Sequence, residues 1–148
     1  MGYTMDPDPE KTAKAFGSEL QISPKESVEV CDMLRGKDVD KAIETLESVI
    51  AEERAVPYKK HKKRMAHQKG VGPGGYPKKV CKKMKAKIEE CRSNAEDKGL
   101  DSENLKIKVL SAHKGSPIEG RRPRAMGRST PHDTKTTNLE IILEEKEA

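Results

Sequence analysis

Aromatic residues are scarce in this chain of 148 residues, which has three tyrosines, one phenylalanine and no tryptophan, or 3% in all. Hydrophobic residues make up 32% of the sequence, against 37% charged residues. The core must therefore be modest and built mainly from aliphatic side chains. Two domains of half this length would each bury too little surface, so one domain over residues 1–148 is expected.

Paired cysteines and long apolar runs are also missing. Cys31, Cys81 and Cys91 are an odd number without a C-x-x-C pair, which argues against a disulfide framework and a structural zinc site. We expect all three to be reduced, semi-buried small hydrophobes. Residues 1–10 are acidic and contain no apolar run, so neither a signal peptide nor a membrane anchor is expected and the predicted location is cytoplasmic.

The sequence shows no catalytic constellation. Its four histidines are dispersed in basic or turn segments without carboxylate-rich neighbours, so we expect surface histidines with no metal or acid–base role: His61, His67, His113 and His132. No serine or cysteine has a base at a readable spacing. We therefore expect a protein that is not an enzyme and needs no cofactor.

Helical signals appear in three places. A capping-box pattern at Ser23 to Glu26 opens the first helix, which Gly36 ends. The second helix follows Asp38, a residue type favoured as a helix cap, and carries one apolar stripe: Val39, Ala42, Ile43, Leu46, Val49 and Ile50. The third should begin near Pro77, end before Gly99 and bury six positions: Val80, Cys81, Met84, Ile88, Cys91 and Ala95.

Strand signals follow the third helix. Apolar and polar residues alternate over 105–109 and again over 139–143, as in half-buried strands of one sheet. Residues 13–22 could supply a third strand.

The formal net charge of +5 hides a strong segregation along the chain. Residues 54–92 contain 14 basic and 2 acidic residues, and residues 114–128 contain 5 and 1. The rest of the chain is acidic. Two cationic segments on an acidic body indicate surfaces aimed at a polyanion, for which nucleic acid is the obvious candidate. Few aromatics are available for base stacking, so recognition should use the nucleic-acid backbone and its shape.

The first cationic segment contains a basic, then glycine-rich stretch, residues 58–76, with no apolar period. We expect a loop that cannot pack itself. Its run GVGPGG at 70–75 matches G-x-G-x-x-G but lacks a preceding strand, so a dinucleotide site is not favoured. The loop and the following helix supply most candidate phosphate-binding residues: Lys59, Lys60, Lys62, Lys63, Arg64, Lys69, Lys78, Lys79, Lys82 and Lys83.

The second cationic segment lies within residues 113–135, which contain three glycines, three prolines and four arginines but no hydrophobic set that could form a core. We expect an extended hairpin arm whose legs of about 12 residues each span roughly 40 Å. Such an arm is marginal alone in water and becomes reasonable when an anion surrounds it. It adds five candidate RNA-binding residues: Lys114, Arg121, Arg122, Arg124 and Arg128.

Residues 120–128 read GRRPRAMGR and closely resemble the R-x-P-R-A-x-G-R signature of large-subunit ribosomal protein twenty-two, the universal tunnel-lining family. Residues 34–37 and 93–96 also resemble the family. The insertion at 56–77 looks like the archaeal and eukaryotic branch. The resemblance covers residues 12–145, nearly the whole chain.

The resemblance implies an α+β fold, with three helices packed on a small three-stranded antiparallel sheet. It also implies a structural protein of the large ribosomal subunit, seated near the exit of the peptide tunnel. Its partners would be large-subunit rRNA, neighbouring ribosomal proteins and the nascent peptide. The family's hairpin penetrates the rRNA, and its tip helps to form the narrow part of the tunnel. The matching tip residues here are Arg124, Ala125, Met126, Gly127 and Arg128. By the same resemblance, Gly127 lets the backbone pass close to RNA.

One feature departs from the family. The first helix carries Glu26, Glu29 and Asp32, where relatives often have a more basic face, and this weakens the expectation of an rRNA contact there. Two other readings share the charge pattern: a free-standing nucleic-acid-binding or chaperone protein, and a small transferase that uses the glycine loop. Retention on salt-washed large subunits separates the first from a ribosomal protein, and nucleotide-induced thermal stabilisation would reveal the second.

Overall fold

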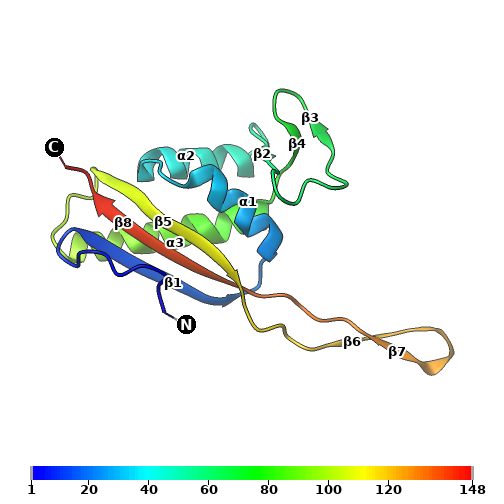
Figure 1. The fold of residues 1–148 in the computed structure, drawn as a ribbon. Coiled ribbons are helices and arrows are strands. Elements are labelled where there is room, and N and C mark those ends of the chain that lie inside the picture. Colours follow the sequence, from blue (N-terminus) through cyan, green and yellow to red (C-terminus); the bar gives the residue numbers. More distant parts are fainter. Residues whose placement is uncertain (1, 148) are drawn as a thin grey trace.

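The computed structural model of the chain describes residues 2–147, so Met1 and Ala148, the ends of the expected domain, lie outside the described residues. Its main sheet has three antiparallel strands in the order β1-β8-β5 (Figure 1). Their bounds are Thr12–Leu20 for β1, Leu105–Lys114 for β5 and Thr137–Glu145 for β8. The strand expected near the N-terminus is therefore present, at the edge of the sheet.

Three helices pack with this sheet: α1 (Pro24–Leu34), α2 (Val39–Ile50) and α3 (Lys78–Asp97). Alternate residues of the central strand β8, namely Leu139, Ile141 and Leu143, join the core cluster with the helices. All six apolar positions predicted for α3 are buried. The predicted α+β class, with three helices and a three-stranded antiparallel sheet, is confirmed.

The two predicted helix caps are wrong in detail. Both helices begin where the sequence indicates, but neither the Ser23 nor the Asp38 side chain bonds a backbone N–H of its helix. Asp38 instead pairs with Lys146 at 2.8 Å and with Lys41 at 3.6 Å. These lysines compete for the carboxylate that the helix N-terminus would otherwise use, and one of them comes from the far end of the chain.

The sheet face that points away from the helices is covered in part by the N-terminal segment. Glu140 of β8 points to this face and is fully buried. It accepts hydrogen bonds from the backbone N–H and the hydroxyl of Thr4. Beside it, the Tyr3 ring packs edge-on against Phe16, with 5.9 Å between ring centroids. The segment before β1 is thereby tied to the sheet.

Between α2 and α3 the chain forms a second, smaller sheet. Its strands are β2 (Val56–Pro57), β3 (His67–Gln68) and β4 (Gly72–Gly75), in the order β2-β4-β3. The expectation of a loop that cannot pack itself is therefore wrong. Its backbone groups pair with one another, and a few side chains reach the main core.

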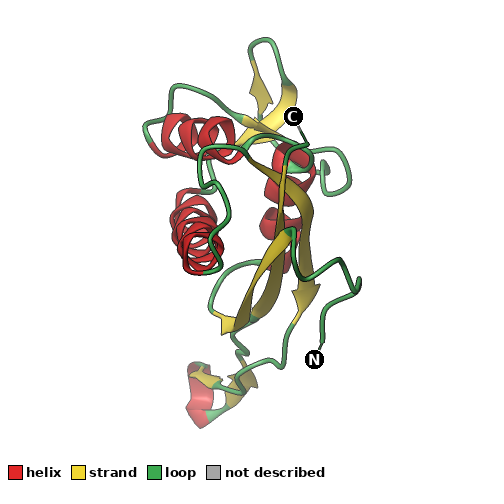
Figure 2. Cartoon of the chain, turned by 90° about the vertical axis from the view of Figure 1, so that its left-hand side faces the viewer, coloured by secondary structure: helices red, strands yellow, loops and turns green. Residues whose placement is uncertain are grey.

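Between β5 and β8 the chain leaves the sheet and runs out and back as a thin arm (Figure 1). A 90° turn of the molecule shows the arm clear of both helices and sheet (Figure 2). Near its end, β6 (Arg121–Pro123) pairs with β7 (Ser129–Pro131), and a short turn, η1 (Ala125–Gly127), joins them. Nearer the domain, an isolated bridge joins Ile118 to Thr134, and single backbone hydrogen bonds link Gly120 with His132 and Gly115 with Thr136. This geometry is consistent with the extended arm expected over residues 113–135.

Within residues 2–147, no helix combines the length and the apolar character that crossing a membrane requires.

Candidate nucleic-acid interface

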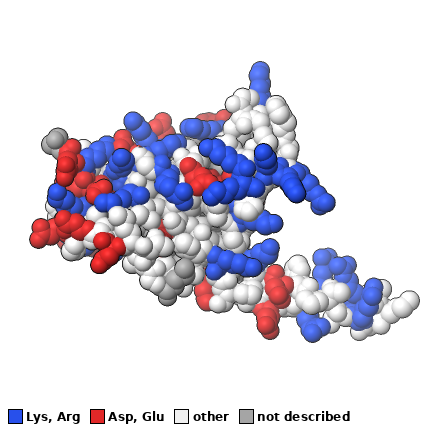
Figure 3. Space-filling view, in the orientation of Figure 1, with Lys and Arg blue, Asp and Glu red and all other residues white. Residues whose placement is uncertain are grey.

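Basic side chains gather at the end of the molecule from which the arm and the small sheet project (Figure 3). At the opposite end, acidic side chains are mixed with lysines, among them Glu144, Glu145 and Glu147 around a shallow hollow. The charge segregation seen along the sequence is therefore also a segregation in space, and the two cationic segments share one end of the domain.

The basic loop, residues 58–76, is anchored in the core by its first residue. Tyr58 is only 6% exposed and belongs to the core cluster, and Met65 packs against it. The backbone N–H of Tyr58 donates to the carbonyl of Pro73 at 3.0 Å. Gly75 lies so near Met65 that a Cβ would be 3.1 Å from its terminal methyl group. The loop thus closes over an apolar anchor that periodicity cannot reveal.

A buried carboxylate on α1 also holds the backbone of the same loop. Glu29 is 1% exposed, and its two oxygens accept three consecutive backbone N–H groups, from Lys59 at 2.8 Å, Lys60 at 2.9 Å and His61 at 3.1 Å. Although burial raises it, these backbone bonds hold the pKa of Glu29 below its ordinary value. The carboxylate is therefore ionised and fully engaged at neutral pH.

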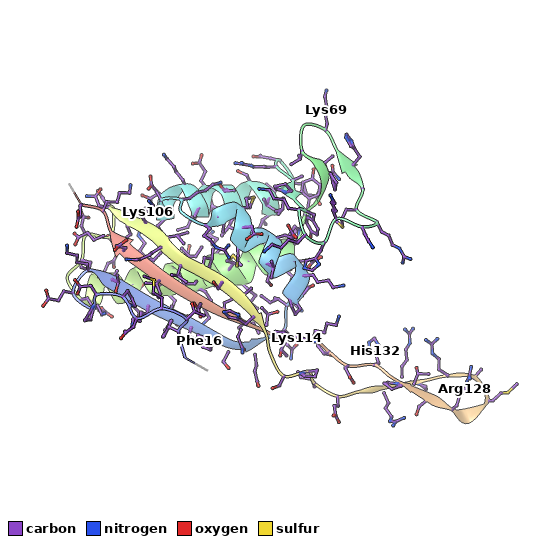
Figure 4. All side chains as sticks on the ribbon, in the orientation of Figure 1. Phe16, Lys69, Lys106, Lys114, Arg128 and His132 are labelled. Atoms are coloured by element: carbon purple, nitrogen blue, oxygen red, sulfur yellow. The ribbon has the colours of Figure 1, made fainter. Side chains whose placement is uncertain are left out.

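The predicted phosphate-binding residues of the loop all lie on its outer surface: Lys59, Lys60, Lys62, Lys63, Arg64 and Lys69. Lys60 forms an ion pair with Asp32, 3.6 Å away. The other five make no ion pair with any residue from 2 to 147. Lys69 stands at the far end of the small sheet (Figure 4). Five unneutralised cations on one loop make a strong local positive potential.

The cationic strip continues onto α3 but stops partway along it. Lys79, Lys82 and Lys83 are exposed and unpaired among the described residues, whereas Lys78 pairs with Glu52 at 2.6 Å. Beyond them, three cations are neutralised by nearby carboxylates: Lys85 by Glu47, Lys87 by Glu90 and Arg92 by Asp40. The candidate interface therefore covers only the first half of the helix.

The arm has no interior. Every residue from 116 to 135 is exposed except Thr130, which is half-buried. Arg121 and Arg124 make only long bonds, of 3.3 and 3.4 Å, to the hydroxyls of Ser129 and Thr130. None of the arm's four arginines, Arg121, Arg122, Arg124 and Arg128, has a carboxylate partner among residues 2–147. Lys114 lies at the root of the arm and Arg128 near its end (Figure 4).

The tip of the arm closes through the backbone N–H of Arg124, which donates to the carbonyl of Arg128 at 2.8 Å. Met126 and Gly127 both have positive φ, 61° and 71°. A left-handed pair makes the turn tight, which suits glycine but is uncommon for methionine. The Met126 side chain is fully exposed. The tip therefore presents one large apolar side chain between two arginines.

The glycine run does not form a nucleotide cradle. Residues 72–75 are themselves strand β4, and the backbone N–H of Gly74 donates to the carbonyl of Ala66 at 3.2 Å. A Cβ on Gly74 would approach the carbonyl oxygen of Val56 to 2.9 Å. Glycine is needed here for close strand pairing. Gly70 and Gly72, with φ of 82° and 81°, shape the turn between β3 and β4.

The roles of two side chains, Glu29 and His113, were not predicted from the sequence. The role of Glu29 was hidden because its donors lie about 30 residues away along the chain. His113 was expected at the surface without a carboxylate neighbour, which is wrong: its Nε2 lies 3.5 Å from buried Glu140. Cross-strand pairing of β5 with β8 creates this proximity. No cluster of three or more potential metal ligands occurs in the part of the chain that the structure describes.

The three cysteines are more deeply buried than expected, each with no exposed surface. Burial raises the pKa of the Cys31, Cys81 and Cys91 thiols to about 12. The Cys91 Sγ lies 3.4 Å from the carbonyl oxygen of Ala13, to which the thiol donates. Such thiols are neutral packing groups, without nucleophilic character at neutral pH.

Comparison with known proteins identifies the family to which this chain is similar. The family model described as ribosomal protein L22p/L17e matches residues 15–144. Similar archaeal proteins, each named large ribosomal subunit protein uL22, cover nearly the whole chain. That of Methanopyrus kandleri is 46% identical over 97% of this chain and 95% of its own length. Those of Methanococcoides burtonii and Archaeoglobus fulgidus are each 43% identical over 97% of this chain and cover 95% and 96% of their own lengths.

Proposed function

Because the chain belongs to the ribosomal protein L22p/L17e family, it is a structural, non-enzymatic component of the large ribosomal subunit in the cytoplasm, and we propose that it binds rRNA there through its two cationic segments. Family membership excludes the two alternative interpretations, a free-standing nucleic-acid-binding or chaperone protein and a transferase. The proposal concerns how the protein is held: the arm and the basic loop neutralise rRNA phosphates, and the acidic end of the domain faces away from RNA.

The observation that carries this proposal is the unpaired state of the arm's arginines. Four guanidinium groups project from a segment with no buried residue, and none meets a carboxylate among residues 2–147. Guanidinium groups bind phosphate oxygens through two parallel hydrogen bonds, which supplies both affinity and orientation. An arm without a core gains its fixed conformation when such contacts surround it.

The tip of the arm belongs to the same proposal. We infer that residues 124–128 reach the wall of the peptide tunnel, beside a neighbouring ribosomal protein, where Met126 faces the nascent peptide. The supporting features are the full exposure of Met126 and the tight turn that places it beyond the last strand pair. An unbranched, polarizable side chain suits a surface that many different peptide sequences pass.

Replacing Arg122, Arg124 and Arg128 together by Ala tests the proposal. The domain should stay folded because these residues contribute nothing to the core. Affinity for large-subunit rRNA should fall, and the slope of log K against log salt should flatten by roughly 2–3 as three phosphate contacts are lost. Incorporation into salt-washed large subunits should fall with it.

The matched control removes three cations that are already neutralised within the protein. Replacing Lys85, Lys87 and Arg92 by Ala changes the net charge equally but touches only the paired half of α3. This variant should retain the wild-type salt dependence and incorporation. Normal incorporation of the arm variant, or an equal loss in both variants, would contradict the proposal.

A further inference from the structure

The basic loop shows an unusual arrangement of backbone and side chains. Three successive N–H groups, of Lys59, Lys60 and His61, converge on one point, as they do in the backbone nests that bind anions. Here the anion is the protein's own Glu29 carboxylate. The backbone therefore faces inward, toward α1, while the side chains of Lys59 and Lys60 lie outside and are exposed.

Burying this carboxylate needs a strong reason. An ionised group removed from water is costly unless its hydrogen bonds are satisfied, and Glu29 is only 1% exposed. Its three donors are backbone N–H groups of exposed loop residues, and none of these residues belongs to the hydrophobic core. Glu26, one turn earlier on the same helix, makes no hydrogen bond to the loop among the described residues. Of the three acidic residues of α1, Glu29 therefore binds the loop backbone, Asp32 pairs with the Lys60 side chain at 3.6 Å, and Glu26 makes neither contact among the described residues.

We propose that Glu29 is a positioning residue for rRNA binding, which fixes the backbone of residues 59–61 so that the basic side chains of the loop stand outward as a preorganised set of phosphate contacts. The inference rests on the proposed function, since it assumes that this loop binds rRNA. A loop ordered in advance does not lose that conformational entropy on binding, so more of the contact free energy appears as affinity.

The inference predicts an effect opposite to simple charge reasoning. Glu29→Gln removes a negative charge near a surface that binds a polyanion, so long-range electrostatics alone predicts tighter binding. The amide, however, offers one acceptor oxygen and turns an NH₂ donor toward N–H groups. Loss of the fixed loop should therefore weaken binding. Glu26→Gln removes the same charge from the same helix and leaves the three bonds intact.

The experiment measures the Kd for transcribed large-subunit rRNA, at one salt concentration, for wild type and both glutamine variants. We expect Glu29→Gln to bind about tenfold more weakly than wild type and Glu26→Gln to bind equally well or more tightly. Hydrogen exchange at the amides of residues 59–61 should accelerate only in Glu29→Gln. Equal affinity of the two variants, with wild type binding, overturns this inference alone. A wild-type chain that does not bind overturns the proposed function, and this inference with it.

A second pair of variants decides the matter if Glu29→Gln does not fold. His61→Pro removes one N–H donor from the loop side, whereas His61→Ala removes the same imidazole and keeps the donor. Neither change alters the buried carboxylate or any lysine side chain. We expect the proline variant to bind rRNA at least about threefold more weakly than the alanine variant, and equal affinities would contradict the role of Glu29.

Discussion

The basic loop and the arm are alike in sequence but are held in different ways. Both are cationic and rich in glycine, and neither has an apolar period. The loop nevertheless has a buried tyrosine, Tyr58, and a carboxylate from another element, Glu29, that gathers its backbone. The arm has no buried residue from 116 to 135. The rest of the protein holds one segment in place, and for the other we propose that surrounding rRNA supplies the contacts.

This difference shows how little is needed to order a polar segment. One aromatic anchor and three backbone bonds to one carboxylate hold a loop of 19 residues, 58–76, with the help of a small sheet. The arm has only short strand pairing, which is marginal in water without a packed face. Matched pairs of variants can test whether the two segments are held in these different ways.

The largest expected difference is in thiol reactivity. The native cysteines are fully buried, and burial raises their pKa to about 12, so at mildly alkaline pH each should react at least about 1000-fold more slowly than a free thiol. A Met126→Cys substitution places a thiol on the fully exposed tip and should react at the free rate. Labelling with a thiol-reactive reagent, followed by intact mass measurement, counts the cysteines that react rapidly. Rapid modification of a native cysteine would show that the core opens easily.

The second difference is in stability. Tyr58→Ala should lower the free energy of unfolding by about 3 kcal/mol, because it empties a site that is 6% exposed. Ile118→Ala, on the arm, removes an aliphatic side chain that is 48% exposed and should change stability by less than about 0.5 kcal/mol. Urea denaturation of both variants compares the two segments directly. Similar losses in both would mean that the arm is packed.

The smallest effect concerns pH. The folded pKa of Glu29 lies below its ordinary 4.5, so its ionised form stabilises the protein above that pH. This contribution is lost as pH falls through the folded pKa. At neutral pH, wild type should exceed Glu29→Gln in unfolding free energy by about 1–3 kcal/mol. The gap should narrow in the acid range, and a gap that stays constant down to acid pH would exclude ionisation of Glu29 as its source.

Most of the fold could be predicted because it rests on periodic patterns. The six buried positions of α3 and the alternating residues of β8 follow directly from hydrophobic spacing. The cap hydrogen bond expected from Asp38 is absent because its carboxylate pairs with Lys146, more than one hundred residues later in the sequence. The small sheet was not predicted because its strands contain glycine and proline in place of an apolar alternation. Only a few scattered side chains, among them Val56 and Tyr58, tie it to the core.

The sequence predicts which residues make up the candidate site, but not which of their charges are neutralised within the protein. The exposed positions of the loop lysines and arm arginines follow from composition alone. Which cations are neutralised does not, because the partners of Lys85 and Arg92 come from α2, at Glu47 and Asp40. Glu29 was noted as an acidic departure from the family pattern, yet its donors lie in a distant loop. Both the neutralised cations and the role of Glu29 depend on contacts between residues that are far apart in the sequence.

The most direct test of the account is hydrogen exchange of the whole chain, free and bound to large-subunit rRNA. The amides of residues 59–61 should be protected in both states, because Glu29 holds them within the protein. The amides of β6 and β7 should exchange rapidly in the free chain and become protected in the complex. An arm already protected without RNA, or still unprotected when RNA is bound, would contradict the account.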